Sequence, residues 1–178
     1  PGVRKRGIGV GTQGIWVSGC MGFPDIYEHT GAIIKLNRDG SADISSGTVD
    51  IGSGQIATLC QIAAAELGVG MDKVRMVYAD TDTVPFDAPT HASRGTYSSG
   101  LAVKAAAAQV RKRVFEIAAG LMEANPDDLD ISNGQVYVKG SPDSARALTD
   151  IIHIAESPFI MDTEQGPRPS SPPEHKGT

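Results

Sequence analysis

The strongest constraint on the fold is a β-hairpin signal in the first third of the chain. Residues 31–38 alternate between apolar and polar side chains, meet the dipeptide Asp39-Gly40, and alternate again over residues 41–51. Asp-Gly favours the tight turns that join antiparallel strands, because these residues tolerate the backbone conformations that such turns need. The second predicted strand runs directly into Gly52-Ser53-Gly54. The sequence therefore predicts an antiparallel hairpin that leads into a glycine-rich loop.

The rest of the chain mixes helix-like and strand-like segments without a regular strand–helix–strand alternation. Apolar residues at helical spacing predict helices over 56–68, 96–124 and 148–156. Strands are predicted over 7–17 and 73–79, and a second hairpin over 129–139 around Asn133-Gly134. This mixture indicates the α+β class, with helices packed against a largely antiparallel sheet.

The character of the sequence changes at Ser157. Five of the 11 prolines follow it, and apolar periodicity is lost. We expect a domain over residues 1–157 and a Pro-rich tail or arm over 158–178, either disordered or packed on something outside this chain. The chain begins with Pro1 rather than Met, which predicts a processed or excised piece.

Composition excludes several classes of function. The chain has 178 residues, 40% of them hydrophobic and 21% charged, and a net charge of −5. An acidic balance argues against nucleic-acid binding, which needs a basic face. There is neither a signal-peptide pattern nor an apolar run long enough for a membrane span. Two cysteines, Cys20 and Cys60, form no disulfide framework, and we expect Cys60 to be a buried small hydrophobe. We therefore expect a cytoplasmic protein.

Two short loops carry the candidate binding chemistry. The first is Asp50-Ile51-Gly52-Ser53-Gly54-Gln55, with Thr58 one turn later, and the second is Pro89-Thr90-His91-Ala92-Ser93-Arg94-Gly95-Thr96. Each opens a predicted helix, where unpaired backbone N–H groups suit phosphate binding. Taken together, the loops predict a phosphorylated ligand held from two sides. Taken singly, each has a structural alternative: a glycine turn with a serine cap, or a capping segment with Arg94 in solvent.

Other motifs predict no catalytic or metal site. The Gly9-to-Gly14 run has the GxGxxG pattern, but it lacks the preceding strand and following helix of a dinucleotide-binding fold. Asp80, Asp82 and Asp87 lie close in sequence, yet their spacing fits no calcium loop. Hydrolase and nucleoside-triphosphatase motifs are absent from the sequence.

Two longer runs resemble the molybdenum hydroxylases, the family of xanthine dehydrogenase, aldehyde oxidase and carbon monoxide dehydrogenase. They extend from Thr48 to Val69 and from Asp72 to Val103. The resemblance covers about residues 7–156 and is densest over 43–104, where both loops and their separation match. The matching region is part of the C-terminal cofactor domain of the large subunit, which is α+β in this family.

The resemblance implies the molybdopterin cofactor as ligand, in bacteria often as its cytosine dinucleotide. In the family, a Gly-Gln-Gly loop and a Thr-x-Ala-Ser loop contact the pterin and phosphate. On this chain they fall at Gly52, Ser53 and Gly54, and at Thr90, His91, Ala92, Ser93 and Thr96, with Arg94 next to Ser93 as in some relatives. Ser53 departs from the usual Gln, and Ala57 departs from a frequent Thr, with Thr58 beside it.

The resemblance also implies partners and a missing catalytic group. The family's catalytic glutamate lies in a Gly-Glu-Pro-type motif downstream, which this sequence lacks. We therefore expect no catalytic residue here and an inactive isolated chain. The expected partners are the remainder of the large subunit, iron–sulfur and FAD subunits or domains, and further copies of the chain. The alternatives are a non-catalytic truncated domain with empty cofactor loops, or an unrelated phosphate-binding module. The substrate and the form of the cofactor stay open.

Overall fold

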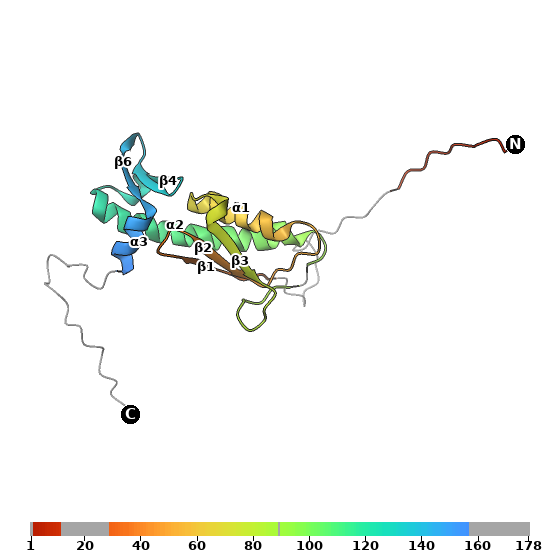
Figure 1. The fold of residues 1–178 in the computed structure, drawn as a ribbon, viewed down its shortest axis with the longest axis horizontal. Helices are drawn as coiled ribbons and strands as arrows, with labels where there is room; N and C mark the ends of the chain where they lie inside the picture. Colours follow the sequence, from red (N-terminus) through yellow and green to blue (C-terminus); the bar gives the residue numbers. More distant parts are fainter. Residues whose placement is uncertain (1, 12–28, 89, 157–178) are drawn as a thin grey trace, which may run out of the picture.

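One long helix, α2 (Gly100–Met122), runs through the molecule and joins two small three-stranded sheets (Figure 1). The computed structural model describes residues 2–11, 29–88 and 90–156. The first half of α2 contributes to the core of the first sheet, and its second half to the core of the second. In this part of the chain, no helix is both long and apolar enough to cross a membrane.

The predicted first hairpin is present at the expected place. Strands β1 (Ala32–Leu36) and β2 (Ala42–Ser46) pair antiparallel, with Ile34 opposite Ile44. The turn between them contains Gly40 at φ 77°, a left-handed conformation that glycine adopts without strain. The second strand is shorter than predicted, because β2 ends before the segment that leads into the glycine-rich loop.

The third strand of this sheet differs from the expected antiparallel arrangement. Strand β3 (Val74–Tyr78) pairs in parallel with β2, after the chain has crossed over through helix α1 (Gln55–Leu67) and the short 3-10 helix η1 (Met71–Lys73). A helical crossover returns the chain to the same end of the sheet, which is why the two strands run in the same direction. The structure thus contains one strand–helix–strand unit that the sequence pattern did not indicate.

Helix α1 packs one apolar face on the first sheet and ends where predicted. Gly68 closes the helix at φ 64°, and its N–H donates to the Ala64 carbonyl. Cys60 is buried in the helix face, which confirms its predicted role as a small hydrophobe, and burial raises the pKa of its thiol. The buried face supplies the first core with Leu59, Cys60, Ala63, Ala64 and Leu67.

The second sheet contains the second predicted hairpin and a strand that was not predicted. Strands β4 (Leu129–Ser132) and β5 (Gln135–Val138) turn at Asn133-Gly134, where both residues have positive φ. The unpredicted strand β6 (Ser141–Ala147) pairs antiparallel with β5. The 3-10 helix η3 (Pro126–Asp128) precedes the sheet, and α3 (Leu148–Glu156) follows it as predicted. Antiparallel pairs predominate over the two sheets, so the α+β class is confirmed.

The predicted glycine-rich strand near the N-terminus is wrong where the structure describes it. Residues 7–11 are exposed and lie in no strand, because none of the described strands pairs with them. In Figure 1 this segment extends away from the helices and sheets. The rest of that predicted strand, residues 12–17, lies outside the described residues, as do Cys20 and the Pro-rich tail over 158–178. The predicted domain boundary at residue 157 stays a prediction.

Gly31 and Gly47 make room for the loop after β3, which leads into the second candidate loop. The loop after β3 passes between the start of β1 and the end of β2, next to Gly31 and Gly47. A Cβ atom on Gly31 would lie 2.7 Å from the Pro85 Cβ, and one on Gly47 would lie 2.7 Å from the Pro85 carbonyl oxygen. These distances are too short for any other residue, so both glycines are needed for close approach.

We expect Gly47→Ala to lower the free energy of unfolding by about 1–3 kcal/mol, because the added methyl group overpacks against backbone at residue 85. Gly120→Ala is the matched control, since a Cβ there meets nothing within 4 Å. It lies inside α2 and is expected to raise the stability by about 0.5–1 kcal/mol. Urea denaturation of both variants measures the two effects. Equal stability of the two variants would contradict the close approach.

Candidate cofactor site

The fold brings the two predicted loops together at one end of the molecule. Helix α1 and the π-helical turn η2 (Gly95–Ser99), which opens α2, begin at the same end (Figure 1). Gln55, the first residue of α1, lies against Gly95, and a Cβ on Gly95 would overlap its side-chain amide. The Thr90 hydroxyl donates to the Val49 carbonyl at 3.2 Å, which ties the second loop to the segment before the first.

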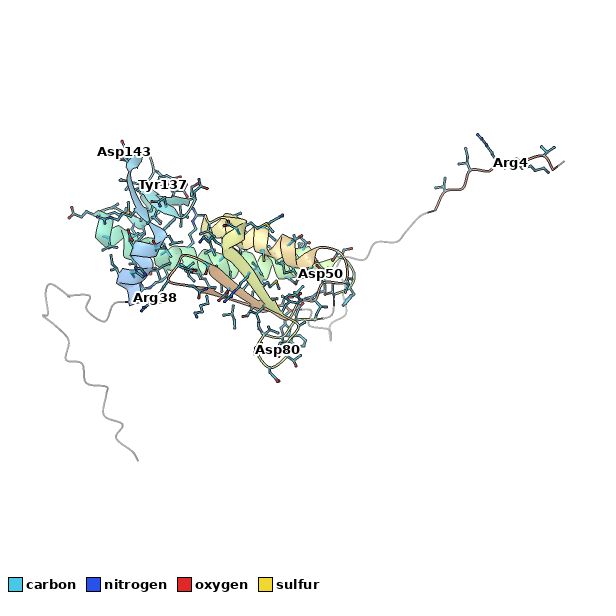
Figure 2. The ribbon with its side chains drawn as sticks, viewed as in Figure 1. Arg4, Arg38, Asp50, Asp80, Tyr137 and Asp143 are labelled. Carbon is cyan, nitrogen blue, oxygen red and sulfur yellow. The ribbon has the colours of Figure 1, made fainter. Side chains whose placement is uncertain are left out.

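The first loop is organised around the carboxylate of Asp50. Asp50 Oδ1 accepts the N–H groups of Gly52 at 2.9 Å and Gly54 at 3.2 Å, and Oδ2 accepts that of Ile56 at 3.5 Å. These hydrogen bonds, that from Gly52 first, lower the pKa of the Asp50 carboxyl. Gly52 and Gly54 have φ values of 99° and 72°, which turn the backbone around the carboxylate. Figure 2 shows Asp50 at this end of the molecule.

The second loop enters its helix through a strained backbone. Ala92 and Ser93 both have left-handed conformations, with φ values of 47° and 58°. Such conformations cost free energy in residues other than glycine and persist only where the surrounding structure holds them. The Arg94 N–H then donates to the His91 carbonyl at 3.0 Å as the helix begins. His91 and Ser93, on either side of Ala92, are both exposed at this end of the molecule.

The anchor of this loop is Arg94, which is 0% exposed. Its guanidinium Nη1 donates to the Ala88 carbonyl at 2.6 Å and to Asp87 Oδ1 at 3.1 Å. Nη2 donates to the Thr30 hydroxyl at 2.6 Å. The alternative that Arg94 lies in solvent is therefore wrong. The side chain points inward and fixes the loop, because a guanidinium away from water needs an ionic partner and several acceptors.

A chain of buried hydroxyls extends the ion pair across the sheet. The Thr48 hydroxyl lies 2.8 Å from Asp87 Oδ2 and 2.8 Å from the Ser99 hydroxyl. Because Thr48 has a single hydroxyl hydrogen, it donates to the carboxylate and accepts from Ser99. Ser46, at the end of β2, joins through its own hydroxyl. The network connects the end of β2, the loop after β3 and the π-helical turn.

Gln55 is a buried polar residue whose side-chain amide is left unsatisfied. It is 4% exposed, and its Nε2 has no hydrogen-bond partner in the described part of the chain. A buried amide donor without an acceptor is costly, and native structures rarely contain one without a reason. The position of this donor between the two helix N-termini fits a ligand with acceptor oxygens bound at this end.

The predicted site residues thus separate into three groups. Arg94 and Gln55 are buried, and the Thr58 hydroxyl donates to the Gly54 carbonyl of its own helix at 3.0 Å. Ala92 and Thr90 are half-buried behind the loop surface. The exposed members are Gly52, Ser53, Gly54, His91, Ser93 and Thr96.

Sequence reasoning missed the residues that hold the loops in place. Asp50 stands at the start of the predicted first loop, but it was given no role there, because nothing in its sequence pattern marks it as a cap. Asp87 was considered with Asp80 and Asp82 for a metal site or an acid/base pair, whereas the structure pairs it with Arg94. In the described residues, no group of three or more acidic, histidine or cysteine side chains is placed to hold a metal. A sequence signal for the buried pair did exist, since Asp87 lies just before the second loop and Arg94 lies within it.

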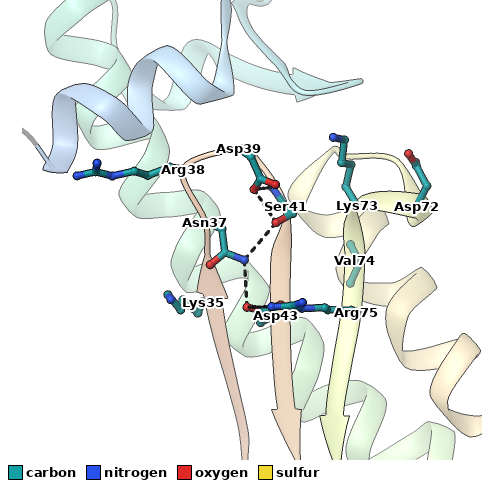
Figure 3. Close-up of a pocket in the computed structure, with 10 residues that line it drawn as sticks. All are labelled: Lys35, Asn37, Arg38, Asp39, Ser41, Asp43, Asp72, Lys73, Val74 and Arg75. Carbon is teal, nitrogen blue, oxygen red and sulfur yellow. Dashed lines mark hydrogen bonds and ion pairs between the residues drawn. The ribbon is translucent and has the colours of Figure 1, made fainter.

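A cavity of about 540 Å³ lies at the opposite end of the first sheet (Figure 3). Two of its charged groups are already matched, because Arg75 forms an ion pair with Asp43, and the Asn37 amide donates to the same carboxylate at 3.0 Å. The Arg75 guanidinium holds the pKa of the Asp43 carboxyl below its usual value. Size alone would favour this cavity as a ligand site. We favour the loop end because an unsatisfied donor lies there.

Comparison with known proteins decides the family. A family model described as the molybdopterin cofactor-binding domain matches residues 1–172. This chain is a molybdopterin-binding domain of the molybdenum hydroxylase family. The resemblance carried by the two loops is therefore confirmed, and molybdopterin is the cofactor of the family to which the domain belongs.

The domain is similar to segments of much longer proteins. The carbon monoxide dehydrogenase large chain of Hydrogenophaga pseudoflava is 34% identical over 118 residues, which cover 66% of this chain and 15% of the relative. Subunit gamma of the 6-hydroxypseudooxynicotine dehydrogenase complex of Paenarthrobacter nicotinovorans is 31% identical over 156 residues, 88% of this chain and 18% of the relative. The domain thus spans less than a fifth of the length of these relatives.

A solved structure supports the fold of the domain. The crystal structure of quinoline 2-oxidoreductase from Pseudomonas putida 86 superposes with a TM-score of 0.69 at 28% identity. The match covers 79% of this chain and 17% of that chain.

We expect Arg94→Ala to lower the free energy of unfolding by about 3–5 kcal/mol, because it leaves the Asp87 carboxylate buried without its charge partner. Arg75→Ala is the matched control. It removes an exposed partner of Asp43, and we expect a loss within about 1 kcal/mol. Chemical denaturation compares the two variants. A loss at Arg94 no larger than that at Arg75 would show that the buried pair does not hold the loop.

Proposed function

We propose that this chain is the part of a molybdenum hydroxylase large subunit that holds the phosphate side of molybdopterin between its two loops. One observation carries the proposal: the N-termini of α1 and η2 meet at one end, with the unsatisfied Gln55 amide between them. Helix N-termini attract anions through their free N–H groups and the helix dipole. This arrangement supports a bound phosphate group.

The predicted residues would have different roles in binding the cofactor. We assign direct contacts to the exposed residues of both loops and to the Gln55 amide, and a positioning role to Arg94 and Asp87, because their side chains face inward. When bound, the cofactor supplies the redox chemistry of molybdenum. The residues of this chain bind and orient it, and we assign no catalytic group among them. The exposed contact residues are Gly52, Ser53, Gly54, His91, Ser93 and Thr96, with Thr58, Thr90 and Ala92 behind them.

For the whole enzyme we propose insertion of water-derived oxygen at a carbon atom of the substrate. Electrons would then pass to iron–sulfur and FAD subunits or domains. The names of the relatives support such an assembly, since one is a large chain and another is a subunit of a dehydrogenase complex. The proposal places the catalytic glutamate and the substrate contacts in the remainder of the large subunit.

Ser93→Tyr should lower the molybdenum content of the co-expressed enzyme complex about tenfold. We expect the ring at this exposed position to block the proposed anion site, and a loss of about 1.4 kcal/mol in binding free energy corresponds to a factor of ten in affinity. Ser132→Tyr is the control, because Ser132 is exposed on β4, away from both loops. Elemental analysis of the purified complexes gives the ratio of molybdenum to large subunit. Unchanged molybdenum and turnover in Ser93→Tyr, or no molybdenum in the unsubstituted complex, would refute the proposal.

We further propose that the isolated chain self-associates through the outer face of the first sheet. Ile33 and Val77 lie in one cross-strand row of that face, on either side of Ser45, and they are 57% and 41% exposed. Among the described strands, β1 and β3 are both edge strands, and unpaired edges favour pairing with another chain. In the whole enzyme this face would be covered by the remainder of the subunit.

Ile33→Lys should weaken self-association about tenfold, because it removes an apolar side chain worth about 1.5–3 kcal/mol when buried and adds a charge. Gln135→Lys adds the same charge on the second sheet and should leave association unchanged. Light scattering over a concentration series measures both variants. A monodisperse monomer of the unsubstituted chain at high concentration would contradict the proposed interface.

A further inference from the structure

The two loops differ in one respect that bears on how they bind an anion. In the first loop, the Asp50 carboxylate already accepts the N–H groups of Gly52, Gly54 and Ile56. A carboxylate at this position is itself an anion bound to a helix N-terminus, so it uses the groups that a phosphate would need. It also places a negative charge where a phosphate would approach.

Within the part of the chain that the structure describes, the second loop holds no such carboxylate. Asp87, the nearest acidic residue in sequence, turns inward and is occupied by Arg94 and Thr48, with a side-chain exposure of 3%. Among the described residues, no carboxylate accepts the N–H groups of Ala92 or Ser93, which precede the helix. Within the described residues, an incoming anion therefore meets no competing carboxylate at the exposed Ser93 of the second loop, whereas the N–H groups of the first loop are already occupied by Asp50.

An independent observation marks this end as a binding site. The Gln55 side chain is 4% exposed, lies against Gly95 and has an Nε2 donor without a partner in the described part of the chain. Gln55 directly follows Gly54, whose N–H group is bound by the Asp50 carboxylate. The Gln55 donor lies against Gly95, just after the second loop's Ser93 and Arg94, whereas Asp50 already occupies the N–H groups of the first loop.

We propose that Asp50 is a built-in competitor for the first loop, so that a phosphorylated ligand engages the second loop first and the first loop only after the Asp50 carboxylate is displaced. The proposal rests on the proposed phosphate-holding function. Asp50 thereby has two effects. It holds the empty first loop in shape, and it lowers the affinity of the site for anions that cannot displace it.

The test uses the 178-residue chain, inorganic pyrophosphate as probe, and backbone amide NMR spectra of the unsubstituted chain and of Asp50→Asn. Asparagine keeps a similar shape and one acceptor oxygen but removes the charge, so it is a weaker competitor. In the unsubstituted chain, pyrophosphate should shift the amide signals of Ala92 and Ser93 and leave those of Gly52 and Gly54 in place. In Asp50→Asn, all four signals should shift, and the dissociation constant should fall about tenfold.

Asp39→Asn is the matched control. Asp39 is also exposed, and its Oδ1 also accepts the N–H of a residue two positions later, that of Ser41 at 3.0 Å. It lies beside Arg38 at the opposite end of the molecule from Asp50 (Figures 2 and 3). The variant removes the same charge and should bind pyrophosphate as the unsubstituted chain does. An equal gain in affinity in Asp39→Asn would show a general charge effect and overturn the proposal.

The remaining outcomes separate this proposal from the proposed function. If pyrophosphate shifts the Gly52 and Gly54 signals equally in the unsubstituted chain, the competition is refuted while the phosphate site stands. If Asp50→Asn responds only at Ala92 and Ser93, Asp50 is not what blocks the first loop. If no signal shifts in either well-folded protein, the loops do not hold phosphate, and both proposals fail. Dispersed amide spectra confirm that each variant is folded before pyrophosphate is added.

Discussion

The buried ion pair between Arg94 and Asp87 is the interaction on which the site depends. A guanidinium away from water is tolerated only with a charge partner and several acceptors, so any arrangement that separates the pair is strongly disfavoured. The pair need not add net stability to have this effect. Together with Thr30 and Thr48 it joins the start of β1, the end of β2 and the loop after β3. Gly47 lets these segments approach closely enough for the pair to form.

The two loops are consequently held in different ways. The second loop rests on the interior of the domain, since the left-handed residues Ala92 and Ser93 directly precede the buried arginine. The first loop is closed from outside by the exposed Asp50 carboxylate. A rigid scaffold below an exposed loop is the usual arrangement of a binding site. Here it places both helix N-termini at one end, where we propose that the cofactor binds.

Local sequence signals predicted most elements of the fold but not how they pair. Asp39-Gly40 and Asn133-Gly134 marked both hairpins, because turn conformations are decided by the residues in the turn. The strand β6 was missed because its residues are mostly polar and do not alternate. The parallel pairing of β2 with β3 depends on where α1 packs, which no short pattern encodes. A strand also needs a partner strand, which a local pattern does not supply, and the predicted N-terminal strand has no partner among the described strands.

The sequence by itself determined the family, the α+β class and the two loops, because these depend on residue types and their spacing along the chain. Only the tertiary structure decided which loop residues face inward and which are exposed. Arg94 has the chemistry of a phosphate ligand, yet it faces inward because Asp87 is buried beside it. Asp50 ends an alternating, strand-like run in the sequence, yet its carboxylate accepts backbone N–H groups of the loop before α1. Side-chain direction depends on neighbours distant in sequence, and those neighbours are set by the packing of the whole domain.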